Sequence, residues 1–151
     1  MAGALEMSTG KLHDTLGERK NHGLFRELLN VLDQTYPASR INRIDVVVDN
    51  GMIHKAKAVN QWLEQHPRFE LLWLPTYGPK ANPIERAFGD VHDKCTRNHQ
   101  RKRLRGLVKD VKHHLQANGP WNYKISRLYD EPEVTAEVDR LLDQQQSRVA
   151  A

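Results

Sequence analysis

The sequence predicts a single α/β domain in which a mixed sheet is flanked by helices. Two short apolar segments rich in β-branched or aromatic residues, 43–48 and 69–74, have the composition of strands. An amphipathic helix is predicted between them, over residues 55–65, so the strands should be parallel and joined by a helical crossover. The length of 151 residues and the apolar content of 38% fit one ordinary hydrophobic core.

The N-terminal part of the chain is expected to form a hairpin and then a helix. Residues 4–16 read as two short strands that turn at Thr9-Gly10. Asn21 is placed to cap a helix, and Pro37 is placed to end it. Between them the apolar side chains recur at helical spacing, at Leu24, Phe25, Leu28, Leu29, Leu32 and Tyr36.

The central elements are predicted to supply much of the core. The 43–48 strand is mostly apolar, so we expect it to be buried on both faces of a parallel sheet. Trp73, in the second strand, is expected to lie in the core. The helix over residues 55–65 should bury Ala58, Val59, Trp62 and Leu63.

Two further helices should follow a Pro-rich loop. Asn82 and Pro83 have the residue types of a helix cap and a first helical position. The buried positions of this helix are predicted to be Ile84, Ala87, Phe88, Val91 and Cys95. A helix over about 101–117 is expected to end before Gly119-Pro120. Its expected buried positions are Leu104, Leu107, Val108, Val111 and Leu115.

The order of these elements is hairpin, helix, strand, helix, strand, helix. It fits an RNase H-like fold, a mixed sheet flanked by helices, that lacks the first of its three antiparallel strands. We therefore expect a domain over residues 1–118 that is truncated at its N-terminus, and a C-terminal extension over 119–151 with a helix from about Pro132.

The distribution of charge favours a polyanionic partner. The net charge of +4 and the pI near 9.3 are weak indicators, because many basic proteins bind no nucleic acid. Residues 94–114 are more informative, because this segment has many basic side chains and a single acidic one, Asp110. Such a segment can neutralise backbone phosphates. A solvated helix face is the alternative. The basic residues singled out are Lys94, Arg97, Arg101, Lys102, Arg103 and Arg105.

No apolar run approaches the roughly 18 residues that a membrane span needs, and the start of the chain has no signal pattern. The lone Cys95 excludes an intrachain disulfide and fits a reducing compartment. The sequence therefore predicts a cytoplasmic protein that does not interact with membranes.

Three short sequence motifs resemble those of a known family. They are Val-Val-Asp49-Asn50 with His54-Lys55 after it, Leu-Pro-Thr-Tyr-Gly-Pro over residues 74–79, and Asn-Pro-Ile-Glu-Arg over residues 82–86. In this order they resemble the catalytic domain of DDE transposases of the bacterial insertion-sequence branch of the mariner-like superfamily. The resemblance is strongest over residues 44–90.

The resemblance implies that Asp49 and Glu85 are catalytic carboxylates that bind Mg²⁺ or Mn²⁺, with two ions in the complete enzyme. Such ions clamp the attacking and leaving oxygens of a phosphodiester in an in-line displacement. The predicted positions suit this role, since Asp49 follows a strand and Glu85 lies in the first turn of a helix. Each residue also has a structural reading: Asp49 as part of an Asp-Asn-Gly turn, and Glu85 as part of a capping box.

Other side chains near these carboxylates are candidates for DNA contacts. Lys80 and Arg86 are expected to bind phosphate. His54 is expected to contact a DNA phosphate or to order a metal-bound water, although it could equally be helix-start surface. A zinc site at His92, Cys95 and His99 is a poor alternative, because a fourth ligand is missing.

In the resembled family a third carboxylate comes from the first strand, and the sequence offers no substitute for it. Two functions therefore stay open. The chain is the catalytic-domain fragment of a DDE transposase that cleaves and transfers DNA strands, or it is an inactive DNA-binding or interaction remnant. The implied partners are transposon and target DNA, and either the missing N-terminal half or another transposase chain.

Overall fold

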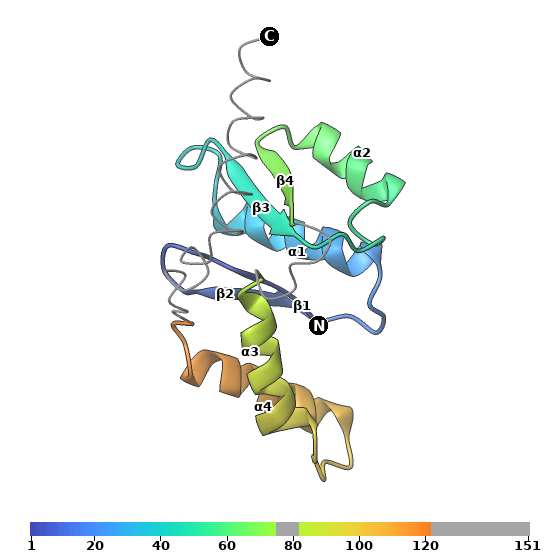
Figure 1. Ribbon diagram of the computed structural model, residues 1–151, viewed down its shortest axis with the longest axis vertical. Coiled ribbons are helices and arrows are strands. Elements are labelled where there is room, and N and C mark those ends of the chain that lie inside the picture. The colour runs from blue at the N-terminus through green and yellow to red at the C-terminus, as the bar shows by residue number, and fades with distance from the viewer. Residues whose placement is uncertain (75–81, 122–151) are drawn as a thin grey trace, which may run out of the picture.

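The computed structural model describes residues 1–74 and 82–121 (Figure 1). The described elements follow the predicted order of hairpin, helix, strand, helix, strand and helices. The predicted mixed α/β class is thereby confirmed. Within the described residues, no helix is long and apolar enough to cross a membrane.

The N-terminal hairpin consists of β1 (Ala2–Leu5) and β2 (Leu12–Thr15), which pair antiparallel with Leu5 opposite Leu12. The turn uses Gly10 at φ 72°, a left-handed conformation that glycine adopts without a steric penalty. The predicted hairpin is confirmed, although its first strand lies closer to the N-terminus than expected, at Ala2–Leu5.

Helix α1 (His22–Thr35) begins where the sequence predicts. The Asn21 side chain accepts a hydrogen bond from the Leu24 N–H at 3.0 Å, which satisfies a donor that the helix itself leaves unpaired. The five apolar residues of the predicted stripe that lie inside the helix are buried. Tyr36 follows the helix and precedes Pro37.

A polar network joins the hairpin to the end of α1. The Tyr36 hydroxyl donates to the Glu6 carboxylate at 2.7 Å and lies 2.8 Å from Nε2 of the buried His13. Because the hydroxyl hydrogen points to Glu6, His13 must donate its Nε2–H to the Tyr36 oxygen. Burial and the hydrogen bond to Glu6 raise the pKa of Tyr36, and burial lowers the pKa of His13.

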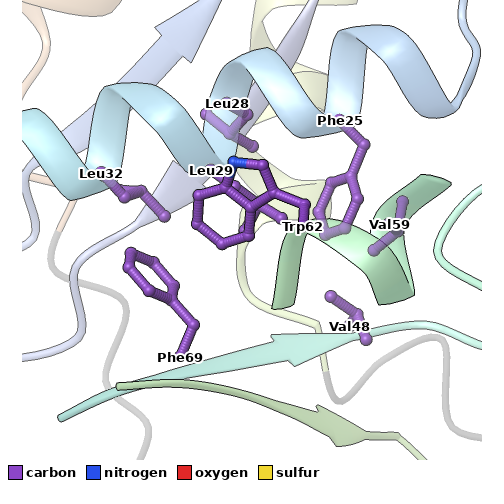
Figure 2. Packing of buried hydrophobic residues seen from close by; sticks show 8 residues of the cluster. All are labelled: Phe25, Leu28, Leu29, Leu32, Val48, Val59, Trp62 and Phe69. Atoms are coloured by element: carbon purple, nitrogen blue, oxygen red, sulfur yellow. The ribbon is translucent and has the colours of Figure 1, made fainter. Parts of the chain in front are cut away.

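The second sheet pairs β3 (Ile44–Val48) with β4 (Phe69–Trp73) in parallel, and α2 (Lys57–Gln65) lies between them in the chain. Helices α1 and α2 cover one face of this sheet. Figure 2 shows the Trp62 side chain among residues from α1 and both strands. The predicted crossover is confirmed. The buried cluster is Phe25, Leu28, Leu29, Leu32, Val48, Val59, Trp62 and Phe69.

The prediction that the 43–48 strand is buried on both faces is wrong. Its outward residues Asp45 and Val47 are exposed, with Val47 at 52%, while Val48 is buried against the helices. Trp73 was expected in the core and is 38% exposed. The reason is that, among the described elements, helices pack on only one face of this two-stranded sheet.

The C-terminal elements pack on the other side of the hairpin from α1. They are α3 (Ile84–Val91), the π-helical turn η2 (His92–Thr96) and α4 (Leu104–Ala117). In Figure 1 the hairpin lies between the β3–β4 pair and these helices. Gly3 permits the close approach, because a Cβ there would lie 3.1 Å from Phe88 Cζ. The second core cluster is Ala87, Val91, Val111, Leu115 and Trp121, with Met1, Leu5, Leu12 and Cys95 against it.

Two details of these helices differ from the prediction. Leu104 is 76% exposed rather than buried, because α4 begins at this residue and its buried positions lie further along the helix. Pro83 is the capping position of α3, so the helix begins one residue later than expected and has no side-chain cap. The helix predicted from about Pro132 lies outside the described residues.

The described strands form two separate two-stranded sheets, and side chains of both pack against α1. Neither β1 nor β3 has a second strand partner among the described residues. The RNase H-like arrangement and its missing first strand therefore stay predictions.

Candidate active site

Asp49 directly follows β3, at the carboxyl end of the parallel pair, and its side chain is 58% exposed. Its Oδ1 atom accepts the Gly51 N–H at 2.9 Å and lies 3.1 Å from His54 Nε2. The hydrogen bond from the Gly51 N–H is typical of the Asp-Asn-Gly turn that is the structural alternative for Asp49. The turn and a functional role are compatible, since Oδ2 accepts no hydrogen bond from the described residues.

His54 is held in place by its surroundings. Its side chain is only 13% exposed, and its ring meets the edge of the buried Phe25 at a centroid distance of 4.3 Å. Burial lowers the pKa of His54, although the negative charge of Asp49 partly opposes this effect. Nδ1 is buried and has no hydrogen-bond partner among the described residues.

Asn50 joins the ends of the two parallel strands. Its Nδ2 donates to the Leu74 carbonyl at 2.6 Å, and its Oδ1 accepts from Lys55 Nζ at 3.2 Å. The Lys55 ammonium also lies 5.2 Å from the centre of the Trp73 ring, at the distance of a cation–π contact. Sequence reasoning took Asn50 as a turn residue and missed this bridge; its place at the end of a predicted strand was the available signal.

Glu85 lies in the first turn of α3 and is exposed. Its N–H donates to the Asn82 carbonyl at 3.1 Å. A capping box is not formed, because the capping residue is Pro83, which has no N–H to offer the glutamate. The structure therefore does not support the interpretation of Glu85 as part of a capping box. Arg86 follows on the same turn and is also exposed.

No hydrogen bond or ion pair joins Asp49 to Glu85 within the described residues, and the hairpin, which packs against both α1 and α3, lies between the elements that carry them. The chain between them passes through residues 75–81, which lie outside the described part, as does the candidate Lys80. Within the described ranges, no group of three or more His, Cys, Asp or Glu side chains is arranged to hold a metal ion. The expectation that the two carboxylates bind metal ions together stays a prediction.

The basic residues divide into two sets. Arg101 donates two hydrogen bonds to Asp110, at 2.7 and 3.0 Å, and Arg97 lies 3.5 Å from Asp93. The others are exposed around the start of α4 or on η2: Lys94, Lys102, Arg103 and Arg105. An open cavity of about 440 Å³ at the start of α4 is lined by Arg101, Lys102, Arg103, Arg105, Gly106 and Lys109. Five basic side chains are therefore gathered on one open surface at the start of α4.

Comparison with known proteins assigns the chain to a family. Residues 1–108 match the family described as DDE superfamily endonuclease, and this range includes both Asp49 and Glu85. A curated relative from Shigella sonnei, named "Insertion element IS630 uncharacterized 39 kDa protein", is 38% identical over 121 residues. The aligned region is 80% of this chain but 35% of that protein, so the chain spans about a third of the relative's length. No solved structure gives a significant match. The family match covers well over half of the chain, which therefore belongs to the DDE superfamily endonucleases.

Proposed function

We propose that this chain is part of the catalytic domain of a DDE transposase that cleaves DNA and transfers the cleaved strand. The observation that carries the proposal is the placement of Asp49, an exposed and oriented carboxylate at the carboxyl end of β3 in a member of this family. The insertion-element name of the relative supports a role in DNA transposition. We place this role in a bacterial cytoplasm, as the sequence predicts. The name of the relative also supports the IS630 and mariner-like branch.

The donor set fits Mg²⁺ or Mn²⁺. Both ions favour oxygen ligands, and Asp49 and Glu85 offer carboxylates that are exposed to solvent. A pair of bound ions would stabilise the attacking and leaving oxygens during phosphodiester cleavage. The attacking groups would be water in the first step and a DNA 3′-hydroxyl in the second.

The chain's own residues would hold the carboxylates in place. The Gly51 N–H and His54 fix one oxygen of Asp49, and Asn50 fixes the loop that carries it. Glu85 would enter from the first turn of α3. This arrangement leaves Asp49 Oδ2 and the Glu85 carboxylate available as ligands.

A third carboxylate would come from a strand outside these 151 residues. We propose that this strand lies between β3 and the hairpin and completes an RNase H-like sheet. Two facts support the proposal: β3 has one unpaired edge within the described structure, and both sheets pack on the same helix, α1. The strand would belong to an upstream part of the same transposase or to a second transposase chain.

The basic surface at the start of α4 would bind the DNA backbone. Lys102, Arg103 and Arg105 are the strongest candidates, because Arg101 already pairs with Asp110. Lys94 on η2 and Arg97 directly after it would extend the surface, and Lys80 and Arg86 would contact phosphate near Glu85. Binding should depend steeply on salt and little on sequence, since such contacts are electrostatic.

An inactive DNA-binding remnant is the second candidate function. The absence of a three-carboxylate group in the described ranges favours it. A plasmid-nicking assay with Mn²⁺ separates the two. The chain alone should be inactive, and activity should appear when the segment encoded upstream is added.

In the restored system, Asp49→Asn or Glu85→Gln should abolish cleavage. Asp45→Asn is the matched control. Asp45 is an exposed carboxylate on β3, the strand that Asp49 directly follows, and it pairs with Arg43. Restored cleavage that survives Asp49→Asn would refute the assigned site. Cleavage by the 151 residues alone, abolished by Glu85→Gln, would show that another carboxylate of this chain completes it.

A further inference from the structure

We infer that His54 is a positioning residue that orients the Asp49 carboxylate for metal binding. The inference rests on the proposed function, which makes Asp49 a metal ligand. It gives His54 a role through Asp49 that differs from the contact with phosphate or metal-bound water suggested by the sequence.

The geometry gives His54 one polar partner. Its Nε2 lies 3.1 Å from Asp49 Oδ1, and the same oxygen accepts the Gly51 N–H at 2.9 Å. The hydrogen bond from Gly51 and the contact with His54 both restrict the rotation of the carboxylate. With Oδ1 occupied, Oδ2 is the oxygen that is left for a ligand.

Burial determines which tautomer His54 adopts. Nδ1 is buried and lacks a partner in the described structure, so a hydrogen on Nδ1 would be an unsatisfied donor. The neutral ring therefore carries its hydrogen on Nε2, the nitrogen that lies 3.1 Å from Asp49 Oδ1. The sequence spacing allows this contact, because the turn at Gly51 and Met52 brings His54 back towards Asp49.

The protein core makes His54 a rigid donor. Its ring packs edge-on against Phe25, which is 4% exposed and belongs to the main core cluster. Asp49 itself is 58% exposed and has little packing of its own to restrict its rotation. A core-held donor can therefore fix an exposed carboxylate, as residues beside metal ligands commonly do. At 13% exposure, His54 is poorly placed to contact a DNA phosphate.

Two replacements separate orientation from simple packing. In His54→Gln the amide nitrogen can occupy the place of Nε2 and still donate to Asp49. In His54→Asn the amide nitrogen lies near the place of Nδ1 and cannot reach. Both variants are polar, but Asn is one methylene shorter than Gln, so urea unfolding followed by circular dichroism must show that each is folded and how much stability each loses.

The readout is Mn²⁺ binding by the full chain, followed through paramagnetic broadening of the Gly51 amide resonance. We expect His54→Asn to require about 10-fold more Mn²⁺ for half-maximal broadening. The original chain and His54→Gln should respond alike. Long-range ¹⁵N–¹H correlation spectra should show the Nε2–H tautomer for His54 before metal is added.

Equal Mn²⁺ responses in all three proteins, or an Nδ1–H tautomer, would overturn the inference while leaving Asp49 as a ligand. Equal responses in the original chain and Asp49→Ala would instead refute the metal site of the proposed function, and the role of His54 with it.

Discussion

Replacing Arg68 should destabilise this fold more than replacing any exposed arginine. Arg68 directly precedes β4, and its guanidinium reaches the end of α1. Two of its nitrogens donate to Asp33 Oδ1, at 2.7 and 3.2 Å. It also donates to the main-chain carbonyls of Asp33, Tyr36 and Ile41. These carbonyls lie at and beyond the helix end, where α1 cannot satisfy them all itself.

The expected loss can be worked from these contacts. The Arg68 side chain is 13% exposed, and a hydrogen bond that involves a charged group contributes about 1.5–3 kcal/mol. The contributions do not add, because one guanidinium makes all the bonds and Asp33, at 35% exposure, can be rehydrated. We therefore expect Arg68→Met to lower the free energy of unfolding by about 3 kcal/mol.

Urea unfolding followed by circular dichroism measures this difference, and Arg43→Met is the matched control. Arg43 also pairs with two carboxylates, Asp45 and Glu70, but its side chain is 55% exposed. The control should therefore leave stability almost unchanged. Similar losses in the two variants would refute the argument that burial and the helix-end carbonyls give Arg68 its importance.

Three further predictions concern the hairpin network and the glycines. Tyr36→Phe should lower the free energy of unfolding by about 1–3 kcal/mol in urea unfolding, because it leaves the buried Nε2–H of His13 without an acceptor. The free energy of unfolding should decrease as the pH falls below 6.5, because burial lowers the pKa of His13 in the folded state and the unfolded chain therefore binds the proton first. His13→Gln should make the free energy of unfolding depend less steeply on pH. An unchanged pH dependence would contradict the assignment of this effect to His13. Gly51→Ala should weaken Mn²⁺ binding, because the added Cβ would lie 2.8 Å from Asp49 Oδ1. In Gly89→Ala the added Cβ would meet no atom within 4 Å, so this variant should raise the melting temperature through better helix propensity. Weaker Mn²⁺ binding in both glycine variants would point to a general effect on the fold.

Local patterns in the sequence predicted the elements well because each pattern acts over a few residues. Asn21 caps α1 as expected, and Pro37 follows its end. The helical stripe of α1 and the helical crossover between β3 and β4 followed from apolar periodicity and spacing. The family resemblance, carried by short words around Asp49 and Glu85, was confirmed at the level of the DDE superfamily.

Side-chain environment was predicted less well, because it depends on what packs from elsewhere in the chain. Val47 and Trp73 have strand-forming, apolar side chains, yet both are exposed because the helices cover only one face of the sheet within the described structure. Leu104 fits the helical pattern of α4 but lies at its first residue and is 76% exposed.

The sequence by itself therefore determined the order of helices and strands, the family and the two candidate carboxylates. Each of these features follows from a pattern of residues that are close together in the sequence. Only the tertiary structure decided that His54 packs on Phe25 and contacts Asp49, and that Asn50 joins two strands. The His54–Phe25 contact joins residues far apart in the chain, and its distance and burial follow from how α1 and the β3–β4 sheet pack together. No pattern within a few residues can specify that packing, because it depends on the shapes of surfaces that meet only after folding.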